Sequence, residues 1–295
     1  DPFTSAYACV SPTAAQSADV RLGLPLRKLV VVPNGIDTAR MESVRRATDR
    51  AAARRALGWA DDDFVFLNTA SIIPAKAQVA LVQAAALAAQ RNPRVRVALP
   101  GRVMDEVYER RLAEQIRRLG AERLVCRLGY HDSADRFYFL ADAFALPSYW
   151  EGWSLALGEA LWAGLPVVAS DVGAARDLLS RTGGELVAPP FASITELEGD
   201  TLGRWLEQDD PAFVQRLGDA LVRTATAPTP PVLDAGLRRV IDARCAYQAY
   251  ARLFEWLLIG GEPAAARAWV RELHAPRAEP PSEIERRTSE LMAGV

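Results

Sequence analysis

Short apolar runs rich in β-branched residues alternate with helix-length segments from about Leu29 onward, and this alternation limits the chain to few folds. Each run is apolar along its whole length, which is typical of a parallel strand buried on both faces. Strands that alternate with helices form a parallel sheet with helices on both faces, so we expect an α/β, Rossmann-like fold. The predicted strands are residues 30–32, 64–69, 95–99, 124–128, 143–146, 167–169 and 185–187.

The intervals between these strands have the length and apolar spacing of helices. The predicted helices are residues 39–57, 78–91, 105–119, 133–141, 155–163 and 174–179, followed beyond Pro190 by 202–207, 212–223 and 237–259. In such a fold the crossover connections are right-handed, and ligand-binding loops gather at the carboxyl ends of the strands. The motifs described below all follow predicted strands, so we expect them at that edge of the sheet.

Composition and charge exclude several classes of function. The 295 residues carry a net charge of −2 with both signs interspersed, which does not match a nucleic-acid-binding surface or a polybasic membrane patch. Cys9, Cys126 and Cys245 are widely spaced and have no partnering histidine pattern, so we expect free thiols in a reducing, cytoplasmic compartment. His131 and His274 are too few for a histidine metal cluster. No apolar run approaches the ~20 residues of a membrane-spanning helix.

The most informative motif is PSYWEGWSLALGEA, residues 147–160. It follows a predicted strand, and Ser154 is placed to cap the helix that comes next. Glu151 then lies in the loop before the helix, and Glu159 lies about 7 Å along it at roughly 1.5 Å per residue. The free N–H groups at the helix start form an anion site between the two carboxylates. This arrangement suits a ligand with hydroxyls at both ends and a phosphate between them, such as a nucleotide-sugar.

These residues resemble the E-x7-E motif of retaining glycosyltransferases with the GT-B fold, in particular those of family 4. The resemblance implies that Glu151 contacts the donor sugar as a catalytic-site residue and that Glu159 binds the ribose of the nucleotide. It also implies that the backbone of Gly152, Trp153 and Ser154 faces the diphosphate. A structural alternative is that Glu151 only complements the helix dipole and that Glu159 is only a solvated surface residue.

Residues 69–77, TASIIPAKA, occupy the place of the family's diphosphate loop, where a Gly-Arg pair precedes a Lys by five residues. Lys76 matches that Lys and is expected to stabilise the leaving diphosphate, a role in which cations replace a metal ion. Ala70 and Ser71 stand where the family has Gly and Arg, and a Ser does not substitute for a bidentate cation. Arg102, after another predicted strand, is the local candidate for the second cation.

The segment RLGYH, residues 127–131, resembles the strand end that lines the base pocket in this family. Gly129 is expected to present its backbone to the base edge, and Tyr130 to cover the face of the base. The alternative is an ordinary glycine turn with a surface aromatic residue. We expect His131 to be a surface residue.

The resemblance covers nearly the whole chain but only the C-terminal half of a GT-B enzyme. Residues 1–4 match the remnant of a cloning vector, and residues 5–28 are expected to be a linker from an acceptor-binding domain that the sequence does not include. Residues 29–259 are the expected donor-binding domain, and residues 260–295 a C-terminal tail. The expected partners are therefore a nucleotide-sugar and this missing domain.

The resemblance implies that the whole enzyme transfers a sugar from a nucleoside-diphosphate donor to a saccharide, lipid-linked or protein acceptor, as in polysaccharide biosynthesis. No cofactor or metal is expected, and the parent protein is expected to act in the cytoplasm or at the inner face of the membrane. The alternative is a degenerate, non-catalytic binding or assembly module, motivated by Ser71. A dinucleotide-dependent oxidoreductase and a P-loop nucleotidase are excluded because neither glycine-rich motif is present.

The predicted C-terminal helix, residues 237–259, carries more large apolar groups than one helix face can hold. These groups are Tyr247, Tyr250, Phe254, Trp256 and Leu257. We expect some of them to be exposed, and then to be covered by the segment after Gly260 or by self-association of two copies.

Overall fold

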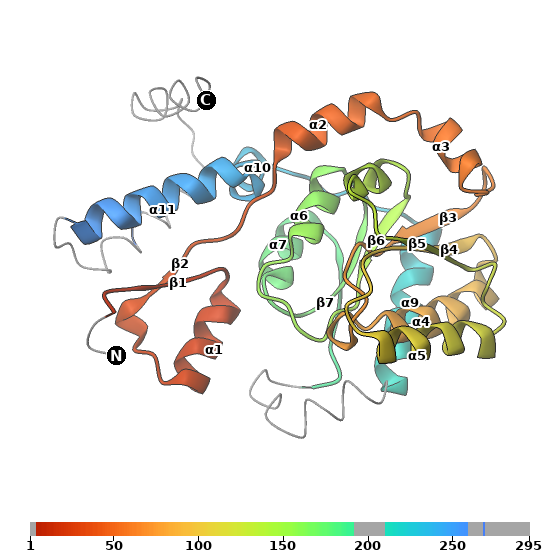
Figure 1. Ribbon diagram of the computed structural model, residues 1–295, viewed down its shortest axis with the longest axis horizontal. Coiled ribbons are helices and arrows are strands. Elements are labelled where there is room, and N and C mark those ends of the chain that lie inside the picture. Colours follow the sequence, from red (N-terminus) through yellow and green to blue (C-terminus); the bar gives the residue numbers. More distant parts are fainter. Residues whose placement is uncertain (1–3, 192–209, 259–267, 269–295) are drawn as a thin grey trace.

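The computed structural model describes residues 4–191, 210–258 and 268, and its main element is a six-stranded, fully parallel sheet (Figure 1). Its strands are β3 (Phe64–Leu67), β4 (Val95–Pro100), β5 (Val125–Gly129), β6 (Ala143–Leu146), β7 (Val167–Ser170) and β8 (Glu185–Val187). All six were predicted to within two residues at either end. The predicted α/β fold class is therefore confirmed.

Helices cover both faces of this sheet. One face packs against α4 (Gln78–Arg91), α5 (Glu106–Arg118) and α9 (Pro211–Thr226). The other packs against α2 (Thr38–Ala47), the 3₁₀ segment η3 (Ala134–Phe139), α6 (Leu155–Trp162), α7 (Ala175–Thr182) and α10 (Ala235–Ile241). Because both faces are covered, the residues of the four inner strands β3, β4, β6 and β7 are almost all buried, as their continuous apolar sequences require, whereas the edge strands β5 and β8 are only partly buried.

The strand order is β5-β4-β3-β6-β7-β8. The chain adds strands outward from β3 to β5, then returns to pair β6 with β3, Phe66 opposite Ala143, and continues in the other direction. The order therefore reverses between β3 and β6. In open α/β sheets the crevice at such a reversal, beyond the carboxyl ends of the strands, is where ligands bind.

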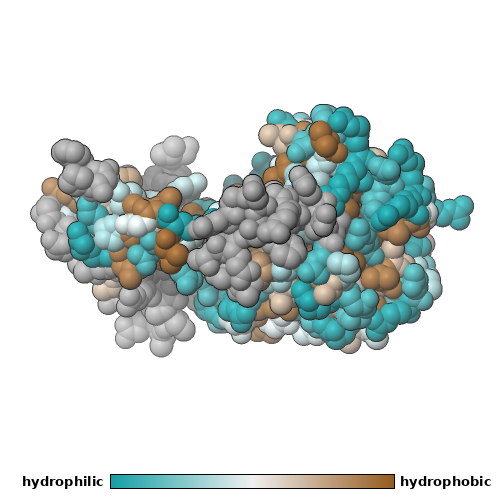
Figure 2. All heavy atoms as spheres, turned by 90° about the horizontal axis from the view of Figure 1, so that it is seen from below, coloured by the Kyte–Doolittle hydropathy of each residue, from teal (hydrophilic) through white to brown (hydrophobic). Residues whose placement is uncertain are grey.

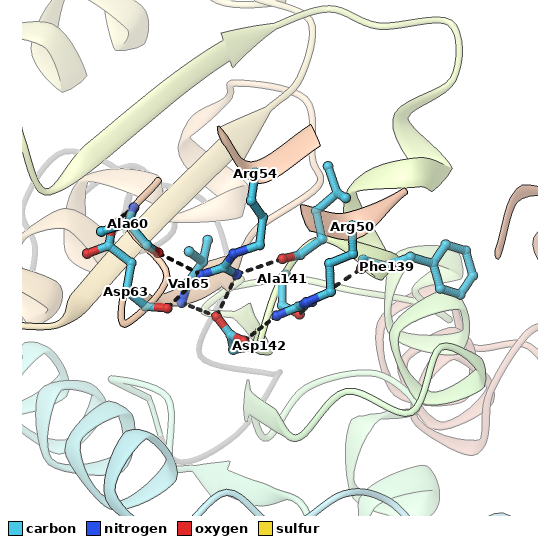
Figure 3. Close-up of polar contacts among 9 residues, drawn as sticks. Arg50, Arg54, Ala60, Asp63, Val65, Phe139, Ala141 and Asp142 are labelled. Atoms are coloured by element: carbon cyan, nitrogen blue, oxygen red, sulfur yellow. Dashed lines mark hydrogen bonds and ion pairs between the residues drawn. The ribbon is translucent and has the colours of Figure 1, made fainter. Parts of the chain in front are cut away.

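A cluster of ion pairs lies at the amino ends of the strands, opposite the carboxyl-end crevice. Arg54 of α3 (Arg50–Ala56) donates to Asp142 Oδ2 at 2.9 Å and to the Leu140 carbonyl oxygen at 2.8 Å. Arg50 donates to Asp142 Oδ1 at 2.5 Å, and the Val65 amide donates to Asp142 Oδ2 at 2.9 Å. Figure 3 shows both arginines converging on this carboxylate. The cluster joins α3 to the amino ends of β3 and β6, which flank the reversal.

We predict that Arg54→Ala destabilises the protein by about 3 kcal/mol, because the partly buried Asp142 carboxylate loses one of its donors and the Leu140 and Asp63 carbonyl oxygens lose the buried guanidinium that donates to them. The measurement is urea unfolding followed by circular dichroism. Arg55→Ala is the matched control, because Arg55 is an exposed arginine on the same helix. Equal midpoints for the two variants would contradict the structural role of the cluster.

A smaller lobe contains β1 (Tyr7–Cys9), α1 (Pro12–Leu22), β2 (Leu29–Val31) and α11 (Ala243–Leu258). β1 and β2 form a separate two-stranded parallel sheet. The predicted strand at 30–32 therefore exists but was wrongly assigned to the main sheet. The expected linker, residues 5–28, contains β1 and α1, neither of which the sequence analysis predicted. Both elements pack with β2 around Cys9, Ala15 and Leu29.

Three predicted helices differ from the structure. Residues 39–57 form α2 and α3, because the Asp49 side chain caps a new helix by accepting from the Ala52 amide at 3.0 Å. Residues 237–259 form two helices, α10 and α11, which are interrupted at Asp242. The interruption occurs because the Ile36 backbone bonds there: its amide donates to the Ile241 carbonyl oxygen at 2.7 Å. Residues 133–141 form the 3₁₀ segment η3 instead of an α-helix. The predicted helix at 202–207 lies outside the described residues.

Helix α11 exposes part of its apolar surface, as the sequence predicts. Tyr247 and Phe254 are each 62% exposed, whereas Tyr250, Trp256 and Leu257 pack partly against the small-lobe core. Figure 2 shows one face of the molecule; over the larger lobe this face is largely hydrophilic, with hydrophobic residues in separate spots. Coverage of α11 by the tail lies outside the described residues, and self-association stays a prediction. No described helix is both long and apolar enough to cross a membrane.

Candidate functional site

Lys76 and Glu151 meet at the point where the strand order reverses. Lys76 ends the 3₁₀ segment η2 (Pro74–Lys76) after β3, and Glu151 lies in the loop after β6. Lys76 Nζ lies 2.6 Å from Glu151 Oε1, and the Ser148 hydroxyl donates to the same oxygen at 2.8 Å. The Glu151 side chain is 8% exposed and that of Lys76 is 24% exposed. Two residues predicted separately as catalytic thus form one partly buried ion pair.

Backbone contacts hold the two loops together. The Tyr149 amide donates to the Ala75 carbonyl oxygen at 2.9 Å, next to the ion pair in both loops. Ala77, directly after Lys76, has φ of +51°, a left-handed conformation that costs an alanine energy. It is the one non-glycine residue with positive φ among those that the structure describes. This backbone allows α4 to start immediately after Lys76.

The start of α6 is capped by a side chain, as the sequence predicts. The Ser154 hydroxyl accepts from the Leu157 amide at 3.3 Å, so the predicted cap is present. The first amides of a helix have no hydrogen-bond partner within it, and here the helix begins at Leu155, four residues after Glu151. Trp153 is buried against Gly158, where an added Cβ would lie 2.7 Å from the indole. Its ring is therefore a packing group, and only its backbone is available to a ligand.

Gly152 joins the ion pair to this helix start. Its carbonyl oxygen accepts from the Ala174 amide at 3.0 Å. Gly173 lies so close behind that an added Cβ would come within 2.5 Å of the same oxygen, and its φ is +57°. The loop after β7 thus supports the loop that carries Glu151.

Glu159 lies in the second turn of α6, beside polar groups that the sequence analysis missed. Burial raises the pKa of its carboxyl; Tyr138 and Arg40 oppose this, and Asp135 adds to it. Arg40 Nε donates to Asp135 at 2.6 Å, which holds the guanidinium in this cluster. The buried Tyr138 hydroxyl lies near Glu159 and Thr69 but makes no hydrogen bond of full geometry among the described residues, and burial and the nearby Glu159 raise its pKa well above the usual value.

We predict that Glu159→Gln raises the thermal stability at pH 7. Because the folded-state pKa of Glu159 is raised, the folded protein holds the proton more tightly than the unfolded chain, and the ionised carboxylate reduces stability. The gain should be present above the raised pKa and vanish below the ordinary value of 4.5.

Melting curves from pH 3.5 to 8 test this prediction. Glu114→Gln, at an exposed position of α5, is the control. A Glu159→Gln variant that is less stable than the wild type at pH 7 would show that the carboxylate serves the fold.

Arg102 and Tyr130 form a stacked pair at the carboxyl ends of β4 and β5. The guanidinium carbon lies 4.4 Å from the centroid of the Tyr130 ring, which is 57% exposed. Gly129 has φ of +69° and turns the chain before Tyr130. The Ile72 amide donates to the Arg102 carbonyl at 2.8 Å, so Arg102 also adjoins the loop that carries the exposed Ser71.

The structure thus brings most predicted site residues to one edge of the sheet, although Arg102 faces Tyr130 and not Lys76. His131 is only partly exposed: its Nε2 lies 2.9 Å from the Leu128 carbonyl oxygen, and its ring packs edge-on against Phe137. The sequence analysis also missed Ser148. Its position three residues before Glu151 was the only signal available for it.

Comparison with known proteins gives a family for this fold and site. A family model described as glycosyl transferases group 1 matches residues 49–211, more than half of the chain. D-inositol 3-phosphate glycosyltransferase from Actinosynnema mirum is 33% identical over 243 residues, which cover 78% of this chain and 49% of that protein. The lipopolysaccharide core biosynthesis mannosyltransferase LpsB from Rhizobium meliloti is 30% identical over 120 residues, covering 40% and 33%. The chain spans half or less of the length of these relatives.

Solved structures agree on the fold. HepE from Anabaena, crystallised with UDP and glucose, superimposes with a TM-score of 0.62 at 24% identity, covering 86% of this chain and 64% of that one. Sucrose-phosphate synthase from Thermosynechococcus elongatus gives a TM-score of 0.57 at 21% identity, covering 86% and 58%. At such identities these matches show the fold alone, which is that of GT-B glycosyltransferases.

Proposed function

The chain belongs to the glycosyl transferases group 1 family, and from this premise we propose that it is the donor-binding part of a retaining enzyme of family 4. The whole enzyme transfers a sugar from a nucleoside diphosphate to a saccharide, lipid-linked or protein acceptor, in the cytoplasm or at the inner face of the membrane. The donor-binding chain alone binds the nucleotide-sugar without transferring it, because the chain spans only about half the length of its transferase relative from Actinosynnema mirum.

The ion pair between Lys76 and Glu151 carries this proposal. A carboxylate accepts hydrogen bonds from sugar hydroxyls, and an ammonium group binds phosphate. Their contact therefore marks the junction between the sugar and the diphosphate of the donor. On binding, the diphosphate takes Lys76 over from Glu151, which frees the carboxylate for the sugar.

The remaining groups extend the site along a nucleotide. The start of α6 binds the diphosphate through its free amides. Glu159 binds the ribose hydroxyls, and the unpaired Tyr138 hydroxyl beside it offers a further hydrogen bond. Tyr130 covers the base, and Gly129 presents its backbone to the base edge. HepE, with the same fold, was crystallised with UDP, which makes UDP the first nucleotide to test.

Leaving-group stabilisation requires positive charge at the diphosphate, and we propose that side chains supply it without a metal ion or other cofactor. Lys76 is one such group. Since Ser71 replaces the second cation, Arg102 must leave Tyr130 and turn toward the phosphates when the donor binds. The alternative is a non-catalytic binding module. The inward-facing Lys76 favours the enzyme.

We predict different effects for the two acids in isothermal titration with UDP, GDP, ADP and their sugars. Glu159→Ala should weaken free nucleotide and nucleotide-sugar alike, by about 1.5–3 kcal/mol for each hydrogen bond to the carboxylate. Glu151→Ala should weaken the sugar form relative to free nucleotide, because the free nucleotide does not reach Glu151 and only gains the Lys76 ammonium that the substitution releases. Unchanged binding in both variants would refute the donor site.

We predict that Lys76→Ala lowers the affinity for UDP sharply and that Ser71→Arg raises it, because these changes remove and add a cation at the diphosphate. Lys28→Ala, in the smaller lobe, is the control for a general loss of positive charge. The same titrations measure both effects. Equal UDP affinity in the Lys76→Ala and Lys28→Ala variants would favour the non-catalytic module.

A further inference from the structure

A cavity of about 540 Å³ lies beside the candidate site, between α1 and the loops that follow β6, β7 and β8. Small-molecule pockets commonly have this size. Its wall includes Glu151 but neither Lys76 nor Glu159. The cavity therefore adjoins the residue proposed for the donor sugar and is separate from the residues proposed for the nucleotide.

Hydrogen bonds hold the wall of this cavity in place. Thr13 and Gln16 of α1 line one side of it. The Thr13 hydroxyl donates to the Gly173 carbonyl oxygen at 2.9 Å, which fastens α1 to the loop after β7. That loop is joined in turn to Gly152 through the Ala174 amide. The cavity is thus formed before any ligand binds.

The lining combines apolar groups with polar ones, and a sugar ring likewise has apolar C–H faces and polar hydroxyls. Trp150 supplies an indole that is 39% exposed, and the Arg21 guanidinium carbon lies 5.3 Å from the ring centroid and steadies it. The apolar Val172 lies in the same wall. Gln16 and Asp177 add an amide and a carboxylate. The apolar C–H faces of a sugar can pack on Trp150 and Val172, and its hydroxyls can form hydrogen bonds with Gln16 and Asp177.

The charges of the lining disfavour an anion. Its carboxylates are Glu151, Asp171 and Asp177, against the single guanidinium of Arg176. Asp171 is paired with Arg176, and Glu151 with Lys76. The side chain of Asp177, an exposed residue, has no hydrogen bond or ion pair within the described residues; partial burial raises its pKa, and the neighbouring Arg176 opposes this. Asp177 is therefore the carboxylate of the lining whose oxygens are free to accept hydrogen bonds from hydroxyls, and its charge disfavours phosphate.

We propose that this cavity is the subsite for a neutral sugar ring of the acceptor, and that it discriminates against phosphorylated polyols. The assignment to the acceptor rests on the proposed function, because an acceptor hydroxyl must come next to the donor sugar that Glu151 holds. The binding of a neutral sugar in the cavity does not depend on it.

The test is titration of the 295-residue chain with methyl glycosides of glucose, galactose and mannose, and with myo-inositol 1-phosphate, each with and without UDP. At least one neutral glycoside should bind in the millimolar range, and the phosphorylated polyol at least tenfold more weakly. Trp150→Ala and Asp177→Ala should each weaken glycoside binding at least fivefold. Asp177→Lys should strengthen binding of the phosphorylated polyol at least tenfold.

Exposed residues away from the cavity provide controls, Tyr247→Ala for the aromatic and Asp61→Ala for the carboxylate. Melting temperatures show that each variant is folded. Glycoside binding that survives both cavity substitutions, or a phosphorylated polyol that binds the wild type as tightly as any glycoside, would overturn the proposal. Glycoside binding without UDP binding would support this cavity and refute the donor site. UDP binding without glycoside binding would overturn this inference alone.

Discussion

The contact between Lys76 and Glu151 is the interaction on which the candidate site depends. The two residues are far apart in the sequence and come from loops after β3 and β6, the neighbours at which the strand order reverses. Each group is partly removed from water, so each needs the other while no ligand is bound. In the proposed function, a nucleoside diphosphate with a sugar attached replaces both halves of the pair at once, which would link recognition of the phosphate to recognition of the sugar.

The two ends of the sheet serve different purposes. At the amino ends, Arg54 and Asp142 form a closed cluster in which each partner is satisfied within the protein. At the carboxyl ends, polar groups remain in need of a partner, such as the buried Tyr138 hydroxyl, and Glu159 has a raised pKa. The cluster at the amino ends thus fixes the strands that carry the site. The unsatisfied polar groups lie at the carboxyl ends, where a ligand can form hydrogen bonds with them.

The sequence predicted the elements better than their arrangement. Strand β6 and helix α4 have the predicted bounds, because each has an unbroken apolar pattern between clear end signals. The pairing of β2 with β1 could not be predicted, since a short apolar run does not specify its sheet. Within the site, the E-x7-E spacing located Glu151 and Glu159. It gave no sign of Arg40, because α2 meets the site only through tertiary packing.

A double-mutant cycle on the Lys76–Glu151 pair, with free UDP as the ligand, tests the account most directly. Glu151→Gln frees Lys76 from its partner, so it should tighten UDP binding when Lys76 is present. The same change should have no effect when Lys76 is replaced by Met, because no cation is then released. If Glu151→Gln changes UDP affinity equally with and without Lys76, the ion pair does not link the phosphate and sugar positions, and the central claim is wrong.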